Sequence, residues 1–161
     1  QNGSGRKRKP RAMSKLIIRQ MEEKDIPQVC AIEEETFSMP WSRKAFEESI
    51  SYYHTLFLVA ELEGEIAGYC GCYQSLEEAE ITNVAVKRQL RGHGIGRRLL
   101  EELMRIGKER GAFAYTLEVR VSNQAAIHLY EKLGFTSFGI RKNFYEKPKE
   151  DAMIMWRHWE V

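Results

Sequence analysis

The pattern of apolar and polar positions predicts a chain in which strands and helices follow one another. Strand-like apolar runs cover residues 16–19, 55–62, 65–73, 79–86, 113–121, 135–141 and 152–159. Apolar residues at helical spacing cover residues 27–36, 42–50, 95–111 and 122–134. Residues 142–151 are expected to form a loop between the last two strands. The order favours an α/β fold, with a mixed sheet of six or seven strands flanked by about four helices.

Local signals indicate where several of these elements begin and end. Asp25 and Ser42 are suited to cap the first two helices, because their side chains can accept a hydrogen bond from a first-turn N–H group. Glu63 and Gly64 form a tight hairpin turn between two strands. Gly111 is expected to end the long third helix, since glycine readily adopts the left-handed conformation found there.

The stretch over residues 81–111, ITNVAVKRQLRGHGIGRRLLEELMRIGKERG, reads as a strand, a glycine-rich turn and a helix. A helix start carries partial positive charge and normally attracts Asp or Glu. This start instead carries Arg91, His93, Arg97 and Arg98. Glycines at alternate positions let backbone N–H groups approach an anion such as phosphate, which would resolve the conflict. The loop lacks the Lys and Ser/Thr of a P-loop, and a plain tight turn is the alternative.

Composition narrows the class of protein. The 161 residues fit one domain, no apolar run reaches the length of about 18 residues that spans a membrane, and no secretory signal is seen. We therefore expect a cytoplasmic protein with no membrane or nucleic-acid partner. Five of the 25 Lys and Arg residues fall within residues 1–12, so 20 basic residues face 23 acidic ones elsewhere. We expect residues 1–12, which include the linker-like QNGSG, to be an added, disordered basic tail, and residues 13–161 to form a single domain.

The cysteines and histidines do not indicate a metal site. Cys30, Cys70 and Cys72 lack metal-ligand spacing, and the last two share one face of a strand. None of the four histidines stands in a zinc-ligand pattern. We expect reduced, buried thiols and no bound metal.

Two polar side chains occupy otherwise apolar elements. Glu118 lies in the middle of an apolar strand, where a carboxylate is costly unless it is paired, solvated at a cleft or used in chemistry. Pairing with Arg120 or another cation is the structural alternative. Tyr130 lies on the apolar stripe of the last helix, where a core tyrosine with its hydroxyl at the rim is the simple interpretation.

The connection that carries Phe37, Pro40 and Trp41 is unusually apolar for a surface loop. Such a segment is either a lid tucked onto the core or one wall of a substrate pocket. Core packing between the two helices that flank it is the alternative.

Several segments resemble the signatures of the GNAT superfamily of N-acetyltransferases. Residues 84–97 are similar to its acetyl-CoA-binding motif, and LEVRVSNQAAIHLYEKLGF over residues 117–135 is similar to its second signature, L-E-V-R-x-S-N-x-x-A-x-x-L-Y-x-x-x-G-F. The F-x-x-P-W-S segment from Phe37 and the ending IRKNFYEKPKEDAMIMW resemble the RimI-type branch, the ribosomal-protein alanine N-acetyltransferases. The likeness covers nearly everything after Met13.

The resemblance implies a GNAT fold and a role for each matching residue. Glu118 would be the general base and Tyr130 the general acid. The coenzyme would be bound by Val84, Ala85, Val86, Arg91, Gly92, His93, Gly94, Ile95, Gly96, Arg97 and Asn123. The substrate would be bound by Phe37, Pro40, Trp41 and Tyr145. Residues 147–150 lack the glycine turn common in this branch, and Phe144 replaces a frequent tyrosine, so a different N-terminal sequence is expected to be selected.

The activity expected from this resemblance is transfer of an acetyl group from acetyl-CoA to a protein N-terminus. The substrate would be the N-terminal alanine of a small-subunit ribosomal protein, attacked directly with no acyl-enzyme. The alternatives are a lysine or small-amine acetyltransferase on the same fold and a non-catalytic acyl-CoA-binding protein.

Overall fold

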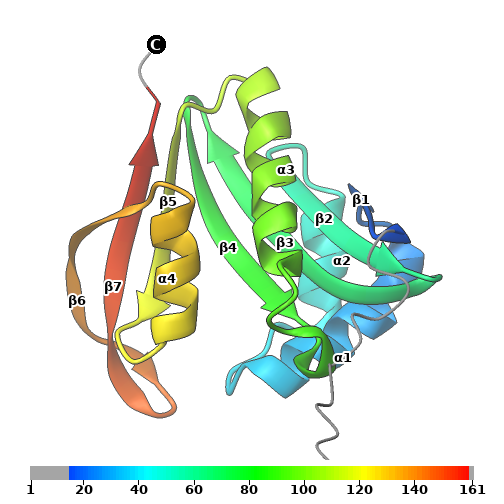
Figure 1. Cartoon of the computed structure of the whole chain (residues 1–161), viewed down its shortest axis with the longest axis horizontal. Coiled ribbons are helices and arrows are strands. Elements are labelled where there is room, and N and C mark those ends of the chain that lie inside the picture. Colours follow the sequence, from blue (N-terminus) through cyan, green and yellow to red (C-terminus); the bar gives the residue numbers. More distant parts are fainter. Residues whose placement is uncertain (1–14, 160–161) are drawn as a thin grey trace, which may run out of the picture.

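The computed structural model describes residues 15–159, and within them seven strands form one sheet (Figure 1). The strands are β1 (Ile17–Gln20), β2 (Thr55–Leu62), β3 (Glu65–Ser75), β4 (Glu78–Val86), β5 (Ala114–Arg120), β6 (Thr136–Glu146) and β7 (Lys149–His158). Their order is β1-β2-β3-β4-β5-β7-β6, and only the β4–β5 pair is parallel among those described. The predicted mixed α/β fold is confirmed. The tail expected at residues 1–12 lies outside the described residues.

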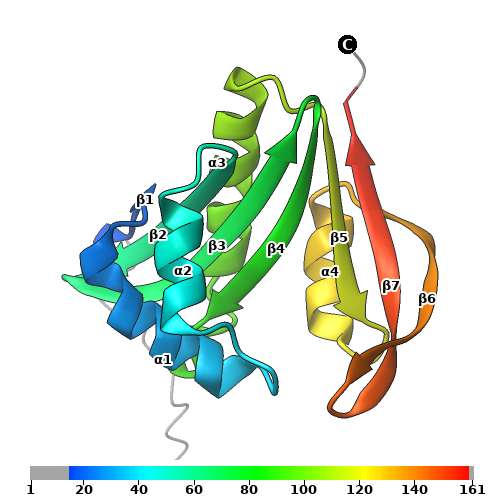
Figure 2. The same ribbon diagram turned by 180° about the vertical axis from the view of Figure 1, so that it is seen from behind.

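Helices cover both faces of the sheet. They are α1 (Ile26–Thr36), α2 (Arg43–Ile50), α3 (Ile95–Glu109) and α4 (Gln124–Lys132). Figure 1 shows α3 and α4 on one face, and Figure 2 shows α1 and α2 on the other. Each pair covers its own apolar cluster, one containing Leu99, Leu103 and Tyr130 and the other Ile26 and Phe46. No helix within residues 15–159 has both the length and the apolar character that a membrane crossing needs.

The sheet divides between its two parallel strands. β4 and β5 pair only at Glu78–Ala114, Ala79–Tyr115 and Glu80–Thr116. Beyond these pairs the strands diverge toward the lower end of the molecule in Figure 1, so residues 81–86 and 117–120 do not pair across this gap. We call this opening the β4/β5 split. It leaves part of each strand's backbone free to contact something other than a neighbouring strand.

A β-bulge in β4 determines which side chains face which helices. The pairing of β4 with β3 skips Thr82, which is therefore one extra residue. Ile81 before the bulge and Val84 after it both pack on the cluster under α3, whereas Asn83 faces α1 and contacts Glu33. Strict alternation would have placed Ile81 and Asn83 on the same face. The bulge reverses the facing of the strand just after it enters the split.

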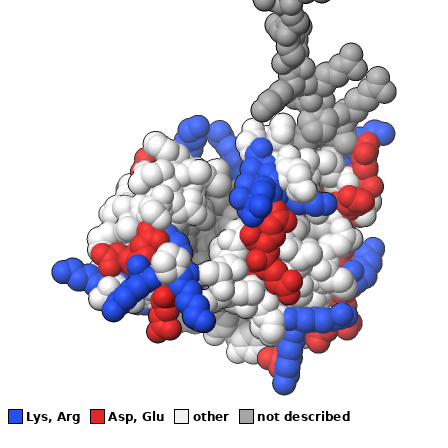
Figure 3. Space-filling model, turned by 90° about the horizontal axis from the view of Figure 1, so that it is seen from below, with Lys and Arg blue, Asp and Glu red and all other residues white. Residues whose placement is uncertain are grey.

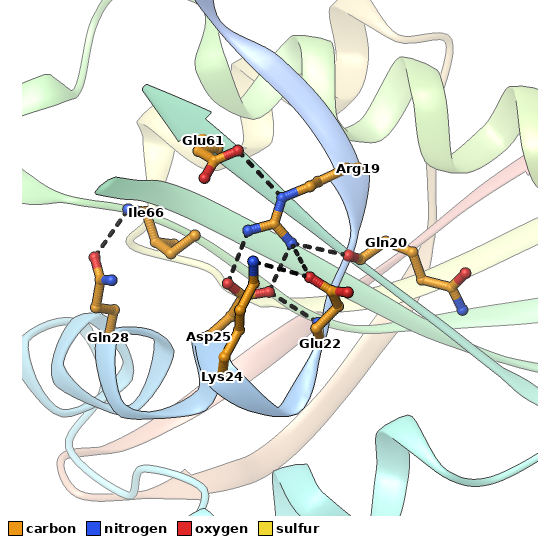
Figure 4. Close-up of polar contacts among 8 residues, drawn as sticks. All are labelled: Arg19, Gln20, Glu22, Lys24, Asp25, Gln28, Glu61 and Ile66. Carbon is orange, nitrogen blue, oxygen red and sulfur yellow. Dashed lines mark hydrogen bonds and ion pairs between the residues drawn. The ribbon is translucent and has the colours of Figure 1, made fainter. Parts of the chain in front are cut away.

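Arg19 of β1 joins this edge strand and its neighbour β2 to the start of α1 (Figure 4). Its guanidinium donates to both carboxylate oxygens of Asp25 at 2.8 Å and to Glu61 of β2 at 3.2 Å. Burial would raise the pKa of Asp25, but the bonds from Arg19 and from the Glu22 N–H outweigh it and hold that pKa below its ordinary value. Asp25 therefore occupies the cap position of α1 without capping it, and that prediction is wrong.

Other local predictions are confirmed. Ser42 caps α2 by accepting the Ala45 N–H at 3.1 Å. Glu63 and Gly64 make the tight β2–β3 turn with φ values of 50° and 82°, and Gly111 follows α3 with φ of 86°.

The prediction of a loop over residues 142–151 is wrong. β6 continues to Glu146 and β7 begins at Lys149, so only Lys147 and Pro148 separate the two strands. Backbone pairing at Tyr145–Glu150 and Glu146–Lys149 extends the hairpin to its tip. Most side chains here are exposed on both faces, so the strand carries no apolar alternation that a sequence pattern could reveal.

Candidate active site

The glycine-rich loop lies where β4 ends and α3 begins. Gly92 and Gly94 have φ values of 82° and 79°, a conformation that residues with a Cβ adopt only at a cost. A Cβ at either position would meet no heavy atom within 4 Å, so the space beside both is open. Gly94 gives α3 no side-chain cap, and the first N–H groups of a helix have no acceptor within it. The loop therefore presents amide donors to open space, as an anion site requires.

The free edge of β4 adds the backbone groups of two more residues, Val84 and Val86. Lys87 donates its N–H to the carbonyl of Ala67 in β3 at 2.8 Å. Backbone groups of an antiparallel strand alternate in direction, so those of Val84 and Val86 point away from β3 and into the split. Ala85 directs its backbone to β3 and buries its side chain on the α1 side. Of the three residues assigned to the coenzyme here, Val84 and Val86 have the better placement.

The arginines beside the loop are engaged by the protein itself. Arg91 donates to the Val86 carbonyl at 3.1 Å and to the Thr36 hydroxyl at 3.2 Å. Arg97 pairs with Glu101 at 2.7 Å on the exposed face of α3. Arg91 therefore braces the loop against β4 and α1, and the charge it contributes to the site is fixed in place.

Other residues assigned to the coenzyme take different positions. The Ile95 side chain is buried in the core, so only its N–H can face a ligand. A Cβ on Gly96 would stand 3.3 Å from Leu129 of α4, so glycine lets α3 and α4 approach each other. Asn123 caps α4 by accepting the Ala126 N–H at 3.2 Å, which leaves its exposed amide NH₂ group for another partner.

The surface around this end of the molecule is hollowed. Viewed from below in Figure 3, a hollow separates two lobes, and Lys and Arg side chains stand beside it. His93 is exposed, as are the flanking Gly92 and Gly94. Positive charge near a recess of this kind favours an anionic ligand.

Glu118 lies in the part of β5 that borders the split. Its carboxylate is 3.1 Å from Arg141 of β6, whereas Arg120, the partner considered from the sequence, pairs with Glu150 at 3.2 Å. Burial raises the pKa of Glu118, the Arg141 charge lowers it and the nearby Glu80 raises it, with a net shift upward. A carboxylate with a raised pKa is better matched to accepting a proton near neutral pH.

Tyr145 lies close to Glu118, and Tyr130 lies close to Tyr145. Tyr130 is 8% exposed, and burial, together with Tyr145 and Cys70 nearby, raises the pKa of its phenol. Burial and the Glu118 charge also raise the pKa of Tyr145, whose ring lies 4.3 Å from the Arg120 guanidinium. Glu118 acts on Tyr145 and Tyr145 acts on Tyr130, so the three side chains follow one another from β5 through β6 to α4. Both phenols are protonated at neutral pH.

Two segments meet on the substrate side expected from the sequence. One is the connection over residues 37–42, which we call the aromatic loop, and the other is the β6–β7 turn. The Ser38 hydroxyl donates to the Lys147 carbonyl. Arg120 holds the same turn by donating to the carbonyls of Lys147 at 3.0 Å and Pro148 at 2.8 Å. The loop and the turn are thereby linked to each other and to β5.

Trp41 contributes to both packing and a cavity. Its ring lies 5.3 Å from that of Phe46 and 6.0 Å from that of Phe57, so the packing alternative holds for this residue. It also lines a cavity of about 430 Å³ whose other walls include Glu80 and Thr82 of β4. Phe37 and Pro40, the other two residues assigned to the substrate in this loop, are exposed.

Comparison with known proteins identifies the family. Residues 26–135 match the model of the acetyltransferase (GNAT) family. The chain belongs to this family. GNAT members use acetyl-CoA as their acetyl donor, which agrees with the donor-rich loop and the open edge of β4.

Individual relatives within the GNAT family are similar over most of their length. A Bacillus subtilis (strain 168) protein is 41% identical over 144 residues, 89% of this chain and 95% of its own, and its name provisionally gives it ribosomal protein bS18-alanine N-acetyltransferase activity. The Escherichia coli (strain K12) enzyme of that name is 38% identical over 140 residues, 86% of this chain and 94% of its own. The crystal structure of the Escherichia coli ribosomal-protein-S18-alanine N-acetyltransferase has a TM-score of 0.83 at 36% identity, covering 91% and 95% of the two chains.

Two residues beside the candidate site were missed from the sequence. Arg141 belongs to an exposed strand that was expected to end there, so nothing indicated its contact with Glu118. Glu33 is 2% exposed in α1, where it contacts the aromatic loop and β4. A signal for Glu33 existed, because it falls seven residues after Ile26 and four residues before Phe37, on the apolar stripe of the first helix. A carboxylate on that stripe needs partners inside the fold.

Proposed function

We propose that this protein transfers the acetyl group of acetyl-CoA to the N-terminal α-amino group of a ribosomal protein that begins with alanine, as the names of its relatives state for them. The proposal rests on one observation, that the groups suited to bind the coenzyme lie beside the candidate base. The donor-rich loop and the free β4 edge lie at the same split as Glu118, with Tyr130 and Tyr145 nearby.

The residues present fit acetyl-CoA. Open space beside Gly92 and Gly94 and the free N–H groups at the start of α3 suit a diphosphate. Val84 and Val86 offer the split a backbone edge that can pair with the amide-containing arm of the coenzyme. When bound, acetyl-CoA supplies an acetyl group activated as a thioester.

Glu118 acts as the general base in the proposed mechanism. An amine attacks the acetyl carbonyl only when it is unprotonated, and an α-amino group has a pKa of about 7.7–8.0 against about 10.4 for lysine. Glu118, directly or through a water molecule, takes the proton that the amine loses. Its raised pKa makes it a stronger base than an ordinary glutamate.

Backbone donors and a tyrosine complete the transfer. One backbone N–H of β4, from Val84 or Val86, donates to the acetyl oxygen as negative charge develops on it. Tyr130 then donates its phenolic proton to the departing sulfur. Burial raises the pKa of Tyr130, so its phenolic proton is present at neutral pH.

The aromatic loop and the β6–β7 turn provide the peptide side. Because Ser38 and Arg120 tie these segments together, they form a fixed boundary beside Glu118. Trp41 and the cavity beside it offer apolar surface for the first side chains of the peptide.

The experiment compares two peptides that start with alanine and contain one internal lysine. One has a free N-terminus and the other a blocked N-terminus, and the mass and site of any added acetyl group are measured. Acetylation of only the free N-terminus is expected. Acetylation of the lysine in both peptides would support the alternative lysine acetyltransferase and overturn the proposal.

A further inference from the structure

We propose that Glu33 is a positioning residue that sets the aromatic loop against the bulge of β4 and thereby controls binding of the peptide substrate. The inference rests on the proposed function, because it concerns the peptide side of that same site.

The Glu33 carboxylate makes three hydrogen bonds to three different elements. One oxygen accepts the Trp41 backbone N–H of the aromatic loop at 3.1 Å. The other accepts the Tyr69 hydroxyl of β3 at 2.5 Å and the Asn83 amide of β4 at 3.3 Å. A single side chain of α1 thus links the loop to two central strands.

Burying the Glu33 carboxylate costs free energy, so packing alone does not explain why a glutamate stands here. Glu33 is 2% exposed, and none of the ion pairs found within residues 15–159 includes it. Three neutral donors compensate the buried carboxylate, and a well-packed apolar side chain would avoid the cost of burying it. What an apolar residue could not provide is a fixed direction for the loop backbone.

The contacts of Glu33 reach both sides of the reaction centre. Trp41 lines the cavity on the peptide side. Asn83 comes directly before Val84, whose backbone faces the split. The Asn83 side-chain oxygen is buried with no hydrogen-bond partner in the described structure, so its bond to Glu33 is what orients this amide. Glu33 therefore fixes the aromatic loop, on the peptide side, relative to β4, the strand that borders the proposed coenzyme site.

Replacing Glu33 by glutamine removes one of the two acceptor oxygens that the three donors need. A glutamine has one acceptor oxygen and one NH₂ group in place of two acceptors. Two donors, from Tyr69 and Asn83, converge on one side and a single N–H, from Trp41, on the other. The oxygen is expected to face the two donors, which leaves the NH₂ group against the Trp41 N–H and displaces the loop.

The test uses the full chain with Glu33→Gln and, as matched control, Glu34→Gln, which makes the same change one residue later on the exposed face of α1. Glu33→Gln is expected to raise the KM for the alanine peptide roughly tenfold, with the KM for acetyl-CoA unchanged. Hydrogen exchange at the Trp41 amide should become faster. Glu34→Gln should change none of these quantities.

The outcomes separate this inference from the proposed function. A wild-type enzyme that acetylates no N-terminus removes the proposed function and this inference with it. An active wild type, together with a folded Glu33→Gln variant whose peptide KM is unchanged, overturns the inference alone. If Glu33→Gln does not fold, Glu33→Asp keeps the charge but shortens the reach, and it must raise the peptide KM selectively for the inference to stand.

Discussion

The open space beside Gly94 makes the coenzyme loop testable by one added methyl group. Gly94→Ala meets no neighbouring atom, but it forces a residue with a Cβ to keep φ at 79°. That conformation costs about 1–2 kcal/mol for an L-residue. For a chain of this size each kcal/mol lowers the Tm by about 2–4 °C, so a loss of about 2–8 °C is expected.

The methyl group should also weaken acetyl-CoA binding. It would stand beside the free N–H groups at the start of α3, and relaxation of the strained residue would rotate those groups away from a bound phosphate. Losing one hydrogen bond to a charged group costs about 1.5–3 kcal/mol, which corresponds to an increase in acetyl-CoA Kd of roughly 10- to 150-fold.

A matched control exists at the other end of the same helix. Gly111 has φ of 86°, and a Cβ there also meets nothing within 4 Å. Gly111→Ala should therefore lower the Tm by a similar amount while leaving acetyl-CoA binding unchanged. Thermal unfolding gives the first quantity and titration calorimetry the second. Equal affinities of the two variants for acetyl-CoA would refute the assignment of the loop as the diphosphate site.

Two further predictions concern the acid and base. Glu118→Gln and Tyr130→Phe should each lower kcat by about 10²- to 10⁴-fold with little change in acetyl-CoA Kd, as rapid-quench and binding assays would show; unchanged turnover would exclude the base role of Glu118 and the acid role of Tyr130. Arg141 lowers the pKa of Glu118, so Arg141→Gln should raise it. Because the base must be deprotonated, the acidic limb of the kcat/KM profile should then move to higher pH, and a shift to lower pH or none would contradict the role of Glu118.

The sequence predicted the elements whose signals are local. Strand-like apolar runs predicted the meander of β2, β3 and β4, and apolar residues at helical spacing predicted the long α3. Alternate glycines predicted the loop at Gly94. The residues gathered at the split could be nominated because their motifs resemble a known family. Their roles stay predictions, although the structure brings Glu118, Tyr130 and Tyr145 together.

Features that depend on pairing between distant segments could not be predicted. The bulge at Thr82 has no sequence signal, because whether a residue is extra depends on the partner strand. The Glu118–Arg141 contact reaches across β7, which lies between β5 and β6 in the sheet, so it depends on an order of strands that no local pattern gives. Asp25 had the right residue type and position for a cap, but the long reach of Arg19 offered its carboxylate a stronger partner.

The bulge at Thr82 also restricts how the gene can change in length. Inserting one codon beside Thr82 would turn the Asn83 side chain toward α3 and the Val84 amide toward β3, so both faces of the strand beyond the bulge would be exchanged in one step. The β2–β3 turn at Glu63 and Gly64 is exposed and has no role in the site, so it could gain residues more freely. Insertions among descendants of this gene should therefore accumulate at this turn and be absent between Ile81 and Val84.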